Sequence, residues 1–162
     1  MRILTLAALL LVVVSGCTSK DTIARHHNHE QVLAQRQAEY DAIKHIKDRL
    51  RTSKVNGTIT CSNKVMCEKA FSLTKDYIQQ IGDMKIQFSD DTTISTYNSS
   101  SSNPLDVSMS ATKTPDFGET EKIKLVASCG YLNKGYDPLF VVCATKVADI
   151  YDGFKVFVES KL

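Results

Sequence analysis

The sequence feature that most constrains the fold is an alternation of apolar and polar residues that recurs in several short runs. The alternation is clearest where Met84, Ile86 and Phe88 take every second position, a spacing that places them on one face of a strand. The polar residues between them would face solvent, which is the pattern of a half-buried strand. Together with the turn residues between runs, the alternation predicts five strands, over residues 58–61, 84–89, 92–97, 105–112 and 122–129.

Apolar residues at helical spacing predict two helices around these strands. The first runs from a cap at Ser62 or Asn63 to about Ile81 and is followed by Gly82. The second begins at Asp137-Pro138 and reaches the C-terminus, because Asp caps helices and Pro suits the first helical position. The apolar face of this second helix consists of Phe140, Cys143, Val147, Ile150, Tyr151, Phe154, Phe157 and Val158.

A further helix is predicted ahead of the strands, over residues 30–53, with Asn28 as its cap. It carries one narrow apolar stripe. The stripe consists of Leu33, Tyr40, Ile43, Ile46 and Leu50. This pattern leaves three roles open for the helix, namely a spacer, a partner helix or a short coiled coil.

The order of these elements predicts an α+β fold for residues 54–162. We expect an antiparallel sheet of about five strands, in the order β-α-β-β-β-β-α, packed against two helices and preceded by an N-terminal helix. This order resembles that of helix-grip and TATA-box-binding-protein-like domains, which implies a long terminal helix across a curved sheet. A related order occurs in an accessory lipoprotein of the outer-membrane barrel-assembly machine, and that resemblance implies a scaffolding role.

The N-terminus predicts export. An apolar run over residues 3–14 follows Arg2 and is too short to cross a bilayer as a stable helix. It ends in the small residues Ser15 and Gly16. Residues 1–16 are therefore interpreted as a signal peptide.

Residues 14–17 read Val-Ser-Gly-Cys and resemble the lipobox of bacterial lipoproteins, in which cleavage precedes a lipidated cysteine. The resemblance implies lipidation of Cys17 and a lipidated tether over residues 17–29. Thr18 stands where an Asp is associated with retention in the inner membrane, so the resemblance implies the outer membrane, facing the periplasm. The alternative is an ordinary cleaved signal with an incidental cysteine.

Four further cysteines, Cys61, Cys67, Cys129 and Cys143, form an even set that an oxidising compartment is expected to pair. Four cysteines allow three connectivities. We favour Cys61–Cys67 and Cys129–Cys143, because each bond would join the end of a strand to the early part of the following helix. A metal site is the competing hypothesis, but residues 55–162 contain no histidine and the spacings differ from paired CxxC motifs.

Residue types that usually carry chemistry are sparse. The absence of histidine from residues 55–162 argues against Ser-His-Asp and Cys-His catalysis, and no Gly-rich phosphate-binding motif is present. A net charge of +2 without a dense basic stretch argues against nucleic-acid binding. We expect no catalytic residue, metal or cofactor, and we interpret the cluster His26, His27, His29 and Glu30 as solvated.

The leading hypothesis is a non-catalytic, lipid-anchored envelope protein that binds or scaffolds another envelope component. Tyr131 and Tyr136 share one loop and are its candidate partner-binding residues. A modest positive surface at one end of the sheet would suit acidic envelope polymers, and the alternative is a solvated sheet face. The lysines of this surface are Lys113, Lys122, Lys124 and Lys134.

Two alternatives belong to other functional classes. One is a small-molecule or lipid site in a groove between the sheet and the C-terminal helix, near four aromatic residues. These are Phe140, Tyr151, Phe154 and Phe157. The other is an envelope hydrolase that uses paired carboxylates. Its candidate residues are Asp90, Asp91, Glu119, Glu121, Asp149 and Asp152.

Overall fold

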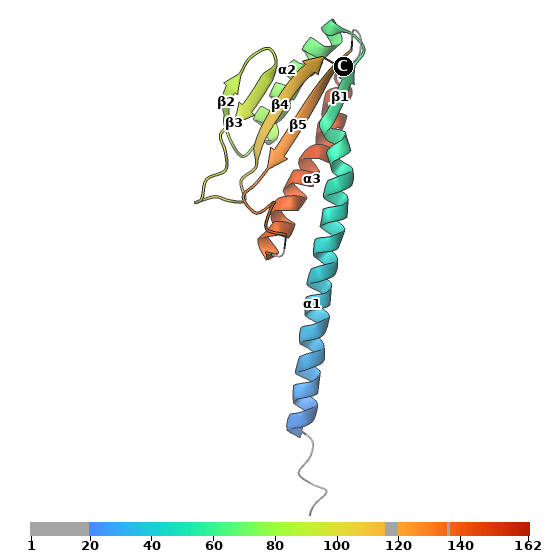
Figure 1. Cartoon of the computed structure of the whole chain (residues 1–162), viewed down its shortest axis with the longest axis vertical. Helices are drawn as coiled ribbons and strands as arrows, with labels where there is room; N and C mark the ends of the chain where they lie inside the picture. Colours follow the sequence, from blue (N-terminus) through green and yellow to red (C-terminus); the bar gives the residue numbers. More distant parts are fainter. Residues whose placement is uncertain (1–19, 116–119, 136) are drawn as a thin grey trace, which may run out of the picture. The chain divides into compact units, whose positions relative to one another are not determined.

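The computed structural model of this chain (Figure 1) describes residues 20–115, 120–135 and 137–162. Some features of the sequence analysis lie outside these residues. They are the signal peptide 1–16, Cys17, Thr18, Glu119 and Tyr136. The chain divides into two compact units, Met1–Tyr40 and Asp41–Leu162.

Helix α1, Lys20–Ser53, begins earlier than predicted. The expected tether over residues 17–29 is helical from Lys20 onward, which corrects the prediction. The reason lies in the composition, since neither Gly nor Pro interrupts residues 20–53 and the segment is rich in residues that tolerate a helix. Asn28, which was expected to cap the helix, lies within it.

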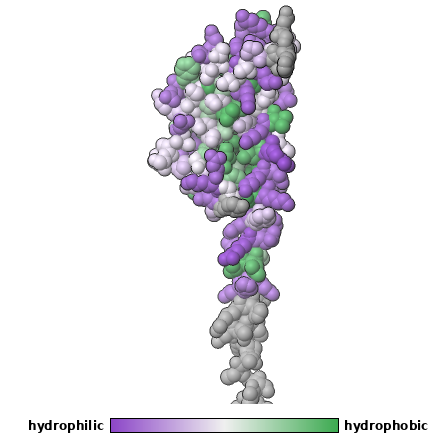
Figure 2. Space-filling model, in the orientation of Figure 1, coloured by the Kyte–Doolittle hydropathy of each residue, from purple (hydrophilic) through white to green (hydrophobic). Residues whose placement is uncertain are grey.

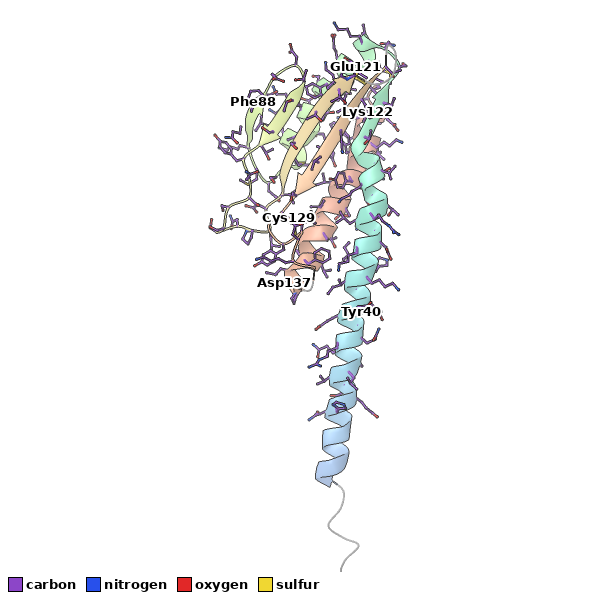
Figure 3. All side chains as sticks on the ribbon, in the orientation of Figure 1. Tyr40, Phe88, Glu121, Lys122, Cys129 and Asp137 are labelled. Carbon is purple, nitrogen blue, oxygen red and sulfur yellow. A yellow bond between two sulfur atoms is a disulfide. The ribbon has the colours of Figure 1, made fainter. Side chains whose placement is uncertain are left out.

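The apolar stripe of α1 changes its exposure along the helix. In the first unit, Leu33 and Tyr40 are 49% and 59% exposed, and Tyr40 projects from the helix in Figure 3. In the second unit, Ile46 and Leu50 are buried in the core. The part of α1 from Asp41 onward therefore belongs to the folded domain.

The second unit is an α+β fold built on a five-stranded antiparallel sheet, as predicted. The strands are β1 (Thr58–Cys61), β2 (Ile86–Ser89), β3 (Thr93–Thr96), β4 (Ser108–Pro115) and β5 (Glu121–Ser128). They lie in the order β1-β5-β4-β3-β2, so β1 pairs with the last strand of the chain. A 3-10 helix, η1 (Lys54–Gly57), leads from α1 into β1.

Helices α2 (Lys64–Ile81) and α3 (Pro138–Glu159) pack against one face of the sheet (Figure 1). The predicted caps are confirmed. The Asn63 side chain accepts a hydrogen bond from the Met66 amide at 2.9 Å, and the Asp137 side chain accepts one from the Leu139 amide at 2.8 Å. Each cap satisfies a donor that a helix start leaves without an intrahelical partner.

The hydrophobic core lies between the sheet and these two helices. Along β5, Ile123 and Leu125 are buried toward the helices, whereas Lys124 and Val126 are exposed on the opposite face. The largest fully buried side chains include Phe154, Ile78, Ile94, Ile123, Leu125, Val107, Val147 and Val158. The alternation in the sequence thus reports which face of the sheet is covered.

Strand β2 corrects one prediction. Met84, Ile86 and Phe88 were expected to face the core together, yet Phe88 is 50% exposed and lies at the outer edge of the sheet in Figure 3. The pairing of β2 with β3 shifts register between Ile86 and Phe88. A bulge of this kind turns the following side chain away from the face set by the residues before it.

The structure contains both disulfides that the sequence analysis favoured. Cys61 is bonded to Cys67 and Cys129 to Cys143, with Cα–Cα distances of 5.2 Å and 6.1 Å. All four cysteines are buried. The first bond joins the end of β1 to α2, and the second joins the residue after β5 to α3.

Candidate functional site

The candidate site is a groove in the second unit, with a volume of about 670 Å³. One wall consists of Lys47, Leu50, Arg51 and Lys54, from the end of α1 and the start of η1. The facing wall consists of residues 132–135, in the loop before α3, and the floor is completed by Asp137 and Phe140 at the start of α3. We call this feature the cationic groove.

The α1 wall is set by helical spacing. Leu50, Arg51 and Lys54 follow Lys47 by three, four and seven residues. Residues at this spacing share one side of a helix. Leu50 is buried while the three cationic residues are exposed. The wall therefore has an apolar base and a positively charged rim.

An ion-pair cluster fastens α1 to α3 beside this wall. Arg49 donates hydrogen bonds to Asp149 at 2.5 Å and to Asp152 at 2.9 Å. These carboxylates raise the pKa of Arg49 through their hydrogen bonds. The cluster holds the helix that carries the cations in a fixed place on the folded domain.

The loop wall is held by a disulfide and by successive turns. The Cys129–Cys143 bond links the start of the loop to the second turn of α3. Within the loop, the Leu132 amide donates to the Cys129 carbonyl at 3.1 Å and the Lys134 amide donates to the Tyr131 carbonyl at 2.9 Å. Figure 3 shows Cys129 and Asp137 at the same end of the sheet.

Positive charge dominates the rim of the groove. Four cations, Lys47, Arg51, Lys54 and Lys134, face one carboxylate, that of Asp137, so the formal charge of the lining is 4 − 1 = +3. The Asp137 carboxylate is engaged in capping α3, and the positive end of the α3 dipole lies at the same place.

Aromatic and aliphatic side chains form the floor. Phe140 and Leu50 are buried and Leu132 is half-buried. The Lys47 ammonium lies 5.6 Å from the centroid of the Phe140 ring, so the cationic rim and the apolar floor are in direct contact. This arrangement suits an anionic ligand that also carries an apolar group.

Of the two tyrosines proposed as partner-binding residues, Tyr131 lies within the described residues and Tyr136 does not. Tyr131 is half-buried against the core, and the Lys134 ammonium lies 4.9 Å from its ring centroid. Tyr131 therefore supports the loop wall from beneath, and Lys134 occupies the exposed position.

Two of the candidate catalytic carboxylates belong to the ion-pair cluster described above. Asp152 accepts hydrogen bonds from Arg49 and from the Asn56 side chain, the latter at 3.2 Å. Burial acts to raise the pKa of Asp152, but its hydrogen bonds from Ser53, Arg49 and Asn56 outweigh this and lower it. Asp149 and Asp152 thus have a structural role on α3.

A second set of carboxylates, Asp90, Asp91 and Glu121, lines a cleft of about 590 Å³ between α2 and the β2–β3 turn. Asp90 accepts hydrogen bonds from the Thr92 and Thr93 amides at 2.8 Å and 2.7 Å, and these bonds lower its pKa. A general acid needs a raised pKa. Asp90 instead stabilises the turn between two strands.

The aromatic residues proposed to line a ligand groove belong to the core. Phe140, Tyr151 and Phe154 are buried, and Phe157 is half-buried. They fill the space between the sheet and α3 in which the groove was expected. A different groove, of about 670 Å³, lies between α2 and α3, where Tyr77 and Phe157 contribute to its lining.

The four lysines expected at one end of the sheet are separated. Lys122 lies at the end of the sheet opposite Asp137 in Figure 3, whereas Lys134 precedes Asp137 in the loop at the other end. Lys113 points to the helix side, with its ammonium 5.4 Å from the Phe71 ring centroid. Only Lys134 contributes to the cationic groove.

The described residues contain no group of three or more His, Cys, Asp or Glu side chains placed to hold a metal ion. His29 and Glu30 are exposed on α1. Across residues 20–115, 120–135 and 137–162, none of the helices combines the length and apolar character that a membrane span requires.

Sequence reasoning missed the α1 side of the groove. Lys47, Arg51 and Lys54 were attributed to no site, although their spacing beside the buried Leu50 is a signal of a cationic helix face. Figure 2 shows mainly hydrophilic and intermediate residues on the visible face of the folded domain, with smaller hydrophobic patches among them. Shape and charge together identify the groove.

Comparisons with protein-family models, curated proteins and solved structures found no match to this chain. The cationic groove combines a concave shape, an apolar floor and a net positive charge.

Proposed function

We propose that this chain is a bacterial envelope lipoprotein, cleaved before Cys17 and anchored in the outer membrane by acyl chains on that residue. Its folded domain, Asp41–Leu162, faces the periplasm and binds another envelope protein without catalysing a reaction. The cationic groove is the binding site, and its charged rim over an apolar floor is the observation that carries the proposal.

The compartment is supported by the cysteines. Two buried disulfides in a folded domain are typical of an oxidising environment such as the periplasm, because cytosolic thiols are kept reduced. The apolar run over residues 3–14 and the lipobox-like residues 14–17 agree with export and lipidation. Several acyl chains on one cysteine would make attachment lasting.

The helical segment after the anchor supports a binding role away from the membrane surface. At about 1.5 Å per residue, residues 20–40 form a helix of about 30 Å. Among the described part of this segment, residues 28–40 are exposed, and most of them are polar. We propose that this segment acts as a spacer between the lipid anchor and the folded domain.

The engagement of three of the candidate carboxylates supports a non-catalytic role. Asp149 and Asp152 bind Arg49, and Asp90 binds the backbone of its own turn. Each of these groups stabilises the fold where a hydrolase would need a carboxyl free to exchange a proton. The hydrolase alternative is therefore disfavoured relative to binding.

The anchor is tested with a Cys17→Ser variant and a Ser19→Ala control, both expressed in a Gram-negative bacterium. We expect the natural chain and the control to sediment with outer membranes and to require detergent for release. The Cys17→Ser variant should remain unprocessed or appear in the soluble fraction. Equal sedimentation of all three chains would contradict the anchor.

Binding through the groove is tested by introducing a photo-cross-linking residue at Asn133, on the rim of the groove. The control carries the same residue at Thr112, on the face of the sheet that the helices do not cover. Both positions are exposed. We expect a discrete envelope protein to be cross-linked from position 133 and not from position 112, and the product to disappear with Arg51→Glu. The same products from both positions, or none from position 133, would contradict the proposed function.

A further inference from the structure

We propose that the cationic groove binds an extended acidic segment of its protein partner, with one apolar side chain of that segment seated on the groove floor. This inference rests on the proposed function and names the chemistry of the partner. It follows from the floor, from the spacing of the cations and from the concave shape of the site.

The floor accounts for the apolar side chain. Leu50, Leu132 and Phe140 come from three different segments and meet at the base of the groove. Their side chains are buried or half-buried. The parts that remain accessible form a small apolar surface at the bottom of the groove. One aliphatic or aromatic side chain covers such a surface, as in anchored protein interfaces.

The spacing of the cations accounts for the extended acidic segment. Arg51 and Lys54 stand on the α1 wall, and Lys134 stands on the facing wall. Successive side chains of an extended chain point to opposite sides. An extended segment in the hollow therefore directs one set of carboxylates toward Arg51 and Lys54 and the other set toward Lys134.

Charge complementarity selects an acidic partner over a basic one. The lining carries a formal +3, and its one carboxylate already caps α3. Arg51 forms an exposed ion pair with Asp48 at 3.4 Å, and an exposed pair of this kind is weak enough to exchange for a ligand carboxylate. The guanidinium of Arg51 can bind a carboxylate through two parallel hydrogen bonds.

The shape favours a peptide over a lipid surface. The apolar floor lies below the charged rim, between a helix and a loop whose ends are fixed by the Cys129–Cys143 bond. The flat surface of a bilayer would contact the rim and leave the floor uncovered. A peptide strand enters the hollow and contacts both.

The test uses the full mature chain in nonionic detergent and a labelled octapeptide, Glu-Asp-Glu-Leu-Phe-Glu-Asp-Glu, with binding followed by fluorescence anisotropy. One control peptide carries amides in place of every carboxylate, and another carries Ser in place of Leu and Phe. We expect each control peptide to bind at least about tenfold more weakly. Equal binding of the amide peptide would overturn the inference.

The protein variants locate the site. Arg51→Glu and Lys54→Glu should each weaken binding of the acidic peptide by about tenfold, whereas Lys124→Glu, an equal charge change on the exposed face of β5, should change it less than about twofold. Unfolding midpoints check that all three variants fold, as expected for exposed positions. Equal weakening by Lys124→Glu would overturn the inference.

A short-chain phosphatidylglycerol, added as a competitor, distinguishes a groove that binds lipid from one that binds an acidic peptide. If it displaces the labelled peptide more strongly than unlabelled peptide does, the groove binds lipid and the inference is wrong. If the peptide fails to bind while position 133 still cross-links an envelope protein, the acidic-segment inference fails and the proposed function stands. Failure of both experiments rejects both.

Discussion

Arg49 of α1 and Asp152 of α3 are joined by a hydrogen-bonded ion pair of 2.9 Å. Asp152 also accepts a hydrogen bond from Asn56, which follows α1, so one carboxylate binds two segments that lead into the sheet. Because the α1 wall of the cationic groove lies directly beside Arg49, this pair connects the stability of the domain to the placement of the groove.

The pair predicts a pH dependence of stability. The pKa of folded Asp152 lies below its unfolded value, so its stabilisation is present above about pH 3.9 and is lost as the pH falls through the folded pKa. We expect Asp152→Asn to lower the free energy of unfolding at neutral pH by about 1 kcal/mol. The variant should also show a shallower loss of stability in acid.

Urea unfolding across this pH range measures both effects. Glu159→Gln serves as the control, because its ion pair with Lys155 is exposed and longer, at 3.8 Å. The control should follow the natural chain at every pH. Parallel profiles for the natural chain and Asp152→Asn would contradict the role of the pair.

A methyl group at Gly153 would lie 2.8 Å from the hydroxyl oxygen of Tyr77. That hydroxyl donates to the Ile150 carbonyl at 2.7 Å, and burial raises the pKa of Tyr77 to about 12. We expect Gly153→Ala to destabilise the fold by about 1–3 kcal/mol through overpacking, although Ala is the better helix former by about 1 kcal/mol.

Chemical denaturation in two backgrounds measures the contact at Gly153. In a Tyr77→Phe background the hydroxyl is absent, so the added methyl group should cost less than in the natural chain. A gain in stability from Gly153→Ala in the natural background would show that Tyr77 does not limit the space at this position.

Removal of the Cys129–Cys143 bond, by alanine at both positions, is expected to lower the free energy of unfolding by about 2–3 kcal/mol, because the bond closes a loop with a sequence separation of 14. The Cys61–Cys67 bond closes a shorter loop, with a separation of 6, so its removal should lower the free energy of unfolding by less. Urea midpoints measure the difference.

The two disulfides should also differ in their effect on binding. The Cys129–Cys143 bond holds the loop wall of the cationic groove, whereas Cys61–Cys67 lies at the end of β1. We therefore expect the acidic peptide to bind more weakly after removal of the first bond and with little change after removal of the second. Equal peptide affinities in the two variants would contradict a role for the loop wall.

Local signals in the sequence predicted the elements well where the local pattern and the tertiary structure agree. Asp137 and Pro138 begin α3 as expected, because cap geometry depends on neighbouring residues alone. Strand β4 runs from Ser108 to Pro115, so it begins and ends three residues later than predicted. The amide of Val107, just before β4, donates a hydrogen bond to the Asp83 carboxylate at 2.9 Å. The apolar alternation of the sequence therefore begins before the strand pairing does.

The candidate site was less predictable than the fold. The cationic groove joins residues 47–54 with residues 132–140, and no local pattern relates segments so far apart. The tyrosines drew attention to the loop that forms one wall of the groove, yet Tyr131 packs inward and Lys134 takes the exposed position. The helical spacing of Lys47, Arg51 and Lys54 was present in the sequence, but it indicates a site only once a facing wall is known.

The intact mass of the chain extracted from bacterial envelopes tests the central claim most directly. The account predicts a chain that begins at Cys17, carries the added mass of acyl groups on that residue and takes up no thiol reagent until it is reduced. A chain that retains residues 1–16, is released without detergent and carries an unmodified sulfur at position 17 would contradict it.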